Sequence, residues 1–182
     1  MKPLLVTAGD PKGIGPEVVV RALRALPEAG PVRLLGDLDA IRRAEQLVGK
    51  APSYVEMVDT RTTEEWPEVR AIRLATEWCL QGEASGMMTG PINKEKLMTT
   101  GFAFTGHTDF LGHLCGVDNP VMAFVGGTLN VSLVTVHCPI IEVAQRLTKP
   151  QIQHVLRTTY AAFDAYGDSD PKLLVCGLNP HA

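Results

Sequence analysis

The chain has 182 residues, of which 45% are hydrophobic and 20% are charged, a balance typical of a globular protein that buries a core without disulfide or metal staples. The formal net charge is −3, and lysine and arginine are scattered, which argues against nucleic-acid and membrane-surface binding. The four cysteines form no CxxC pair, so we expect reduced thiols in a cytoplasmic protein. No apolar stretch approaches the roughly 20 residues that cross a bilayer, and the N-terminus turns polar too early for a signal peptide.

Strand-like and helix-like segments alternate through the first part of the chain. Short apolar runs predict buried strands at residues 4–7, 32–35, 54–58 and 87–89. Apolar residues at helical spacing predict helices between these strands, and Pro16 and Pro67 suit the first turns of two of them. Repeated strand–helix units predict an α/β fold with a doubly wound, largely parallel sheet.

The pattern changes after residue 120. Residues 121–125 and 129–136 flank a Gly-Gly pair and predict a hairpin, so we expect a mixed sheet. A long helix is predicted from about Thr148, and residues 173–176 predict a last strand. The chain then stops in a loop where a covering helix is expected, so we expect that further residues belong to the domain.

A glycine-rich turn at residues 9–17 joins the first predicted strand to the first predicted helix. Such a turn offers backbone N–H groups to an anion. It lacks the dinucleotide fingerprint, because Val18 stands where the third glycine belongs, and it lacks the Gly-Lys-Ser/Thr of a Walker A loop. Taken alone, this segment is better explained as a tight turn whose glycines adopt positive φ.

Two later loops, at residues 89–94 and 105–109, place polar residues after apolar runs. Thr108 is predicted to cap the helix that follows it. His107 then lies beside a helix N-terminus, where its ring and nearby N–H groups suit a phosphate or carboxylate, and Lys94 adds positive charge. A structural role explains each of these residues taken alone.

Two further histidines follow predicted strands. His137 comes directly after residues 129–136, and His181 follows the strand at 173–176. Histidines at the carboxyl ends of strands in one sheet favour a metal site, although the sequence supplies no obvious third ligand. For each of them a hydrogen-bonded wall residue is the alternative. His113 and His154 are expected to be structural.

Together these segments resemble the 4-hydroxythreonine-4-phosphate dehydrogenase family of vitamin B6 synthesis. The resemblance spans nearly the whole chain and rests on residues 7–17, 89–94, 104–110, 135–139 and 176–182. It departs from the family at Asn93, where many relatives carry histidine, and in a short link after residue 58. It implies the N-terminal half of a two-lobed, isopropylmalate-dehydrogenase-like fold, with a first lobe at about 1–105 and the start of a second at about 106–182.

The resemblance also implies a reaction. A homodimer would oxidise 4-phosphohydroxy-L-threonine with NAD (or NADP) and a divalent metal (Zn, Mg or Co), and the product would lose CO2 to give 3-amino-2-oxopropyl phosphate for pyridoxal phosphate biosynthesis. By resemblance, His107, Thr108 and Lys94 bind the phosphorylated substrate, and His137 and His181 are two of three metal-binding histidines. The third histidine and most NAD contacts lie in the second half of the family's chain. No catalytic residue is assigned.

Three alternatives remain open from the sequence. A related dehydrogenase of a four-carbon sugar-acid phosphate, threonate or erythronate 4-phosphate, needs the same phosphate, metal and NAD sites. A phosphate acyltransferase has a distantly similar α/β fold but needs no metal histidines. The third alternative is an inactive truncated fragment that only folds or dimerises.

Overall fold

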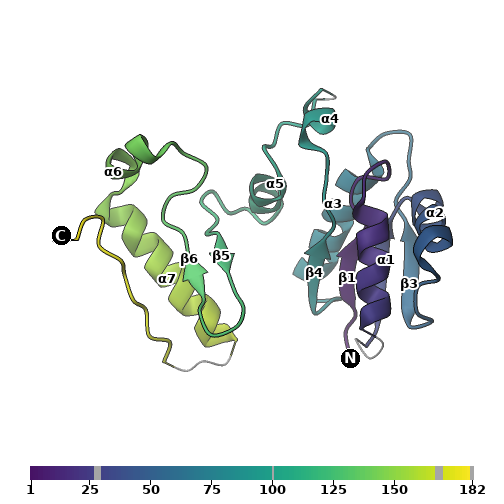
Figure 1. Ribbon diagram of the computed structural model, residues 1–182, viewed down its shortest axis with the longest axis horizontal. Coiled ribbons are helices and arrows are strands. Elements are labelled where there is room, and N and C mark those ends of the chain that lie inside the picture. The colour runs from purple at the N-terminus through teal and green to yellow at the C-terminus, as the bar shows by residue number, and fades with distance from the viewer. Residues whose placement is uncertain (27–29, 100, 167–169, 181–182) are drawn as a thin grey trace. The chain divides into compact units, whose positions relative to one another are not determined.

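A computed structural model describes residues 1–26, 30–99, 101–166 and 170–180 of the chain. The chain divides into two compact units, Met1–Asp118 and Asn119–Ala182, and each is described by itself (Figure 1). The first unit contains a four-stranded parallel sheet, and the second contains a two-stranded antiparallel sheet. None of the helices among the described residues is both long enough and apolar enough to span a lipid bilayer.

The first unit alternates strands and helices as the sequence predicts. Its strands are β1 (Leu4–Thr7), β2 (Val32–Gly36), β3 (Val55–Asp59) and β4 (Gly86–Thr89). Its helices are α1 (Gly15–Ala25), α2 (Leu38–Val48), α3 (Pro67–Leu80), α4 (Lys94–Met98) and α5 (His107–Leu114). Proline occupies the first turn of α1 and of α3, where its missing N–H breaks no helical hydrogen bond.

The parallel sheet has the strand order β3-β2-β1-β4. From β1 the chain passes outward to β2 and β3, and it then returns across β1 to place β4 on the other side. Successive connections therefore leave the middle of the sheet in opposite directions, which makes the β1–β4 pair the topological switch point. Ligands of open α/β sheets bind outside the carboxyl ends of the strands at such a point.

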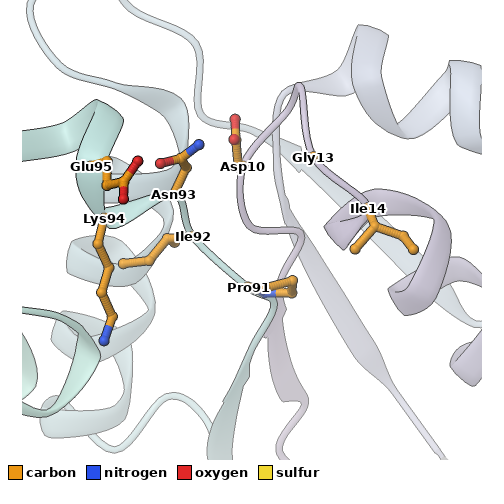
Figure 2. A pocket seen from close by; sticks show the side chains of 8 residues that line it. All are labelled: Asp10, Gly13, Ile14, Pro91, Ile92, Asn93, Lys94 and Glu95. Carbon is orange, nitrogen blue, oxygen red and sulfur yellow. The ribbon is translucent and has the colours of Figure 1, made fainter.

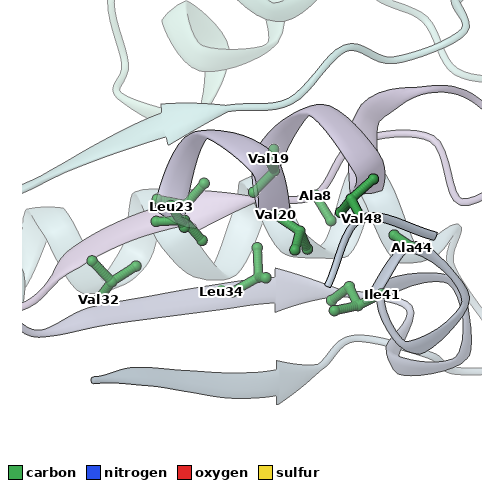
Figure 3. Packing of buried hydrophobic residues seen from close by; sticks show 10 residues of the cluster. Ala8, Val19, Val20, Leu23, Val32, Leu34, Ile41, Ala44 and Val48 are labelled. Carbon is green, nitrogen blue, oxygen red and sulfur yellow. The ribbon is translucent and has the colours of Figure 1, made fainter. Parts of the chain in front are cut away.

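Helices cover both faces of this sheet. Because side chains alternate along a strand, successive residues face opposite sides of the sheet. Leu34 packs against α1 and α2 (Figure 3), as does Val6, whereas Leu5 and Leu35 pack against α3. Leu5, Leu34 and Leu35 are fully buried, and burial of each such side chain stabilises the fold by roughly 1.5–3 kcal/mol. The doubly wound arrangement predicted from the sequence is confirmed.

A third cluster attaches α4 and α5 to α3. Phe110 of α5 and Leu97 of α4 are buried against Val69 and Ile72 of α3. The first compact unit therefore extends beyond residue 105, where the sequence predicts the end of the first lobe. The division of a longer protein into two lobes stays a prediction.

The second unit is less regular than the sequence predicts. It contains β5 (Ala123–Phe124), β6 (Val131–Ser132), a 3-10 turn (Ile140–Glu142), α6 (Val143–Arg146) and α7 (Lys149–Ala165). The hairpin is present but short, and it forms a sheet of its own; Val125 and Leu129 are 70% and 73% exposed, so burial does not favour longer strands. The start of α7 is as predicted, because the Thr148 side chain accepts a hydrogen bond from Gln151 N at 3.3 Å.

The predicted strand at residues 173–176 is wrong for this structure. These residues have no regular secondary structure, and Leu174 is 96% exposed. A strand requires a hydrogen-bonded neighbour, and within the described part of the second unit no strand pairs with this segment. Its apolar character alone was therefore an insufficient signal.

Candidate functional site

Two loops meet at the switch point of the sheet. Gly9, after β1, has φ +78°, and a Cβ on it would lie 2.2 Å from the carbonyl oxygen of Pro91, after β4. Asp10 N donates a hydrogen bond to that same oxygen at 2.9 Å, and Gly90 N donates one to Thr7 O at 2.8 Å. The glycines therefore allow the two loops to pack backbone against backbone, which a side chain at Gly9 would prevent.

A pocket of about 380 Å³ lies between these loops (Figure 2). Asn93 fixes one wall, because its side chain caps α4 by accepting a hydrogen bond from Lys96 N at 3.0 Å. The pocket is lined by Asp10, Gly13, Ile14, Pro91, Ile92, Asn93, Lys94 and Glu95. It occupies the place where a doubly wound sheet binds its ligands, so it is the candidate site of the first unit.

Lys94 connects the pocket to His107. In Figure 2 the Lys94 side chain extends away from Asp10. Its Nζ lies 3.1 Å from the position that a Cβ would take on Gly106, the residue before His107. Gly106 is the N-cap of α5 and has no side chain to cap the first N–H groups of that helix. Positive charge and a helix N-terminus thus lie beside the His107 ring.

The His107 ring has an unsatisfied polar atom. Its Nε2 is buried and has no hydrogen-bond partner among the described residues. Burial, and then the charge of Lys94, lower the pKa of His107 below its ordinary value, so the free ring is held neutral near pH 7. An anion beside Nε2 would give this nitrogen a partner and offset the charge of Lys94. The sequence-predicted pair of Lys94 and His107 is therefore brought together in the structure.

Thr108 lies elsewhere than the sequence predicts. α5 begins at His107, so Thr108 is its second residue rather than its cap, and its side chain is exposed. The turn is held instead by Asp109, which accepts hydrogen bonds from Thr105 N and Thr105 Oγ1. The capping prediction is wrong because the glycine before His107, not Thr108, leaves the helical conformation.

A buried ion-pair cluster behind the pocket was missed from the sequence. Lys96 Nζ donates to Asp10 Oδ1 at 3.0 Å and to Glu68 Oε1 at 2.9 Å, and it lies 4.3 Å from the centre of the Trp66 ring. The side chain of Glu68 is fully buried and that of Asp10 is 8% exposed. Of these residues, only Asp10 lies in a segment that the sequence singled out, the glycine-rich turn after β1.

His137 belongs to the second unit. It is exposed, and among the described residues it is the only one other than glycine with a positive φ, at 50°. Such strained backbone clusters at functional sites. Next to it along the chain, Val134, Thr135 and Val136 line a pocket of about 420 Å³ together with Arg146 and other residues of α6 and α7.

The predicted metal site is only partly visible. His181 lies outside the described residues, so its position relative to His137 is not described. Within the described ranges no group of three or more His, Cys, Asp and Glu side chains could hold a metal ion. An exposed imidazole on strained backbone nevertheless fits a divalent metal in donor type.

The two remaining described histidines have structural contacts. The His113 ring lies 5.0 Å from the Phe104 ring in the first unit. In the second unit, His154 Nε2 is 2.8 Å from Asn119 O. These contacts agree with the structural role predicted for both residues.

The chain is similar in sequence to a family of known proteins. The family described as pyridoxal phosphate biosynthetic protein PdxA matches residues 33–182. A 4-hydroxythreonine-4-phosphate dehydrogenase from Chromobacterium violaceum is 33% identical over 98% of the chain and 62% of the relative. A protein from Cutibacterium acnes described as a D-threonate 4-phosphate dehydrogenase is 32% identical over 99% of the chain and 61% of the relative.

The chain is also similar in fold to a solved structure of a 4-hydroxythreonine-4-phosphate dehydrogenase. The crystal structure of 4-hydroxythreonine-4-phosphate dehydrogenase from Klebsiella pneumoniae matches with a TM-score of 0.87 at 28% identity, over 99% of this chain and 63% of that one. The chain thus spans about three-fifths of the length of the relatives it matches. The matched residues, the sequence identity and the shared fold show that the chain belongs to the PdxA family.

Proposed function

We propose that the protein oxidises 4-phosphohydroxy-L-threonine with NAD and a divalent metal, and that the oxidised product loses CO2 to give 3-amino-2-oxopropyl phosphate. The observation that carries the proposal is the buried, unpartnered Nε2 of His107 beside the ammonium group of Lys94. Proteins described as 4-hydroxythreonine-4-phosphate dehydrogenases are 32% and 33% identical to the chain in sequence.

In this proposal, His107 and Lys94 bind the phosphate of the substrate. Charge-assisted hydrogen bonds to phosphate oxygens are roughly twice as strong as neutral ones. Thr108 follows His107 in the first turn of α5, where its backbone N–H and hydroxyl are suited to the same anion. Anchoring the phosphate holds the carbon that is oxidised in one orientation, which lowers the entropic part of the barrier.

His137 and His181 would hold the metal. A divalent metal, when bound, lowers the pKa of a coordinated hydroxyl and stabilises negative charge on oxygen, while NAD accepts the hydride. The exposed ring of His137 is free of a structural role in the described part of the second unit, which suits a ligand. No residue of this chain is assigned to NAD, and a homodimer is part of the same proposal.

A second candidate is oxidation of D-threonate 4-phosphate. The C. acnes relative carries that description and is as similar to the chain as the phosphohydroxythreonine dehydrogenases are. Both substrates place a phosphate at one end, so the site at His107 and Lys94 serves either. They differ in the group on the carbon next to the carboxylate, which is an ammonium in one and a hydroxyl in the other.

The experiment is a steady-state assay of NADH formation with each phosphorylated acid, NAD and a divalent metal. We expect turnover of the phosphorylated amino acid, loss of turnover on chelation of the metal, and loss of turnover in His137→Ala with an unchanged circular dichroism spectrum. His154→Ala, an exchange of another histidine in the second unit, is the control. Turnover that survives chelation, or no turnover of either acid, contradicts the proposal.

A further inference from the structure

The carboxylate of Asp10 is held rigidly at one end of the pocket. Its Oδ1 accepts hydrogen bonds from Lys96 Nζ at 3.0 Å and from Lys12 N at 3.1 Å. Both hydrogen bonds that the side chain accepts within the described part of the chain end on this one oxygen. A Cβ at Gly13 would lie 3.5 Å from Oδ2, so glycine there keeps space beside the second oxygen. Asp10 lines the pocket, and its Oδ2 accepts no hydrogen bond from the described residues.

The cluster behind Asp10 is centred on the ammonium group of Lys96. Burial alone would lower the pKa of Lys96, but its hydrogen bonds to Glu68 and Asp10 outweigh burial and raise the pKa above its ordinary value. Lys96 thus stays charged at neutral pH. Two carboxylates thus face one ammonium group, and Oε2 of Glu68 has no hydrogen-bond partner among the described residues.

Acidic and basic side chains both line the pocket: Asp10 and Glu95 are acidic, and Lys94 is basic. Asp10 lies at one end, and the side chain of Lys94 extends away from it (Figure 2). The Lys94 Nζ lies beside Gly106, at the start of α5. A ligand that matches this pattern carries an anionic group at one end and a cationic group at the other. A phosphorylated amino acid has both groups, whereas a phosphorylated sugar acid has no cation.

We propose that Asp10, positioned by Lys96, receives the ammonium group of a phosphorylated amino acid whose phosphate lies at Lys94 and His107. The inference rests on the proposed function and makes Asp10 the residue that selects an amino acid over a sugar acid. A carboxylate forms a charge-assisted hydrogen bond with an ammonium group and only a weaker one with a hydroxyl. Lys96 is a positioning residue, because it acts through Asp10.

The test is calorimetric titration of the 182-residue chain with 4-phosphohydroxy-L-threonine and with D-threonate 4-phosphate. Asp10→Asn keeps an oxygen that can accept from Lys96 and Lys12 but removes the charge. We expect it to weaken binding of the amino acid by about tenfold or more, with little change for the sugar acid. Glu64→Gln is the matched control, since this exposed carboxylate belongs to the same unit but does not line the pocket.

Two Lys96 variants test whether this side chain acts through Asp10. Lys96→Arg should retain the preference for the amino acid, and Lys96→Met should lose it to the same extent as Asp10→Asn. Two results would overturn this inference and leave the proposed function standing. In one, Asp10→Asn weakens the binding of both ligands equally. In the other, the unaltered chain binds the sugar acid as tightly as the amino acid. If neither ligand binds, or if His107→Gln leaves both affinities unchanged, the proposed function fails together with it.

Discussion

The Nε2 atom of His107 is buried and has no hydrogen-bond partner among the described residues. The pKa of this ring therefore depends on the charges close to it. In the free protein, burial and the charge of Lys94 lower its pKa, so protonation of the ring opposes folding. The unfolded chain binds the proton more tightly than the folded chain does. Stability is therefore complete above the ordinary histidine pKa of about 6.5, and it falls as the pH drops from there toward the lowered value.

This linkage gives a prediction for His107→Gln. The free energy of unfolding of the unaltered chain should decrease as the pH falls below about 6.5. In the glutamine variant this decrease should be smaller. Urea denaturation at a series of pH values measures both. His113→Gln, on the exposed side of the same helix, should leave the pH dependence as it is. An unchanged slope in His107→Gln contradicts the account of this ring.

Binding of an anion reverses the effect of pH on the same histidine. A dianion beside Nε2 favours the protonated ring, so its affinity should rise as the pH falls from about 8 to about 6, through the histidine range. Sulfate is the suitable probe, because its own charge is constant over these values. Titration calorimetry should show this rise in the unaltered chain and a flat profile in His107→Gln. A flat profile in both proteins would show that the anion does not bind at His107.

Lys96 is a residue whose removal should cost stability. Lys96→Met leaves Asp10 and Glu68 buried without their cation, and breaking a buried pair in this way costs about 3–5 kcal/mol. Urea denaturation should show this loss, while Lys94→Met, at an exposed position, should change the free energy of unfolding little. Similar midpoints for the two variants contradict the assignment of Lys96 as the centre of a buried cluster.

The sequence predicted part of this site for identifiable reasons. Lys94 and His107 lie in loops that follow apolar runs and begin short helices, so local patterns were sufficient to find them. The cluster of Asp10, Lys96 and Glu68 joins residues that are 86 and 28 positions apart, and no local pattern predicts such pairs. The contacts follow only once β1, α3 and α4 are arranged around the sheet.

Among the elements, the best predicted are those whose apolar residues are buried. β1 was predicted at its observed bounds, because its apolar run lies between helices on both faces of the sheet. The strand predicted at residues 173–176 is absent, although its composition is similar, because nothing in the described part of its unit pairs with it. Strand formation depends on a neighbouring strand as well as on hydrophobicity.

The contact between the loops after β1 and β4 is tested by Gly9→Ala. A non-glycine residue with positive φ costs about 1–3 kcal/mol, and the added methyl group would also collide with Pro91 O at 2.2 Å. Gly101→Ala separates these effects, because Gly101 has φ +88° but open space around the added group. Denaturation should show a larger loss for Gly9→Ala, and equal losses would mean that the loops do not pack as described.

The two units of the molecule differ in how much apolar surface they bury. Fully buried leucine, isoleucine and valine side chains are numerous in the first unit, whereas Val155 is the only buried hydrophobic residue described in the second apart from a proline. Local opening requires less free energy where fewer apolar contacts are broken. The second unit is therefore the less stable part of this chain.

Hydrogen exchange measures this difference directly. Amides of β1 and β2 should exchange only through global unfolding, and amides of α7 should exchange at a lower free energy. Exchange followed by mass spectrometry, with peptides covering 4–36 and 149–165, resolves the two. Equal protection of both peptides contradicts the division of stability between the units.

The central claim is that the Lys94–His107 site recognises the phosphate of the substrate. Calorimetric titration with 4-phosphohydroxy-L-threonine and with its unphosphorylated form, 4-hydroxy-L-threonine, tests it most directly. The account predicts that the unaltered chain binds the phosphorylated form at least about tenfold more tightly, as expected for charge-assisted hydrogen bonds, and that His107→Gln removes most of this preference. Equal affinities for the two forms, or an undiminished preference in His107→Gln, would contradict the claim.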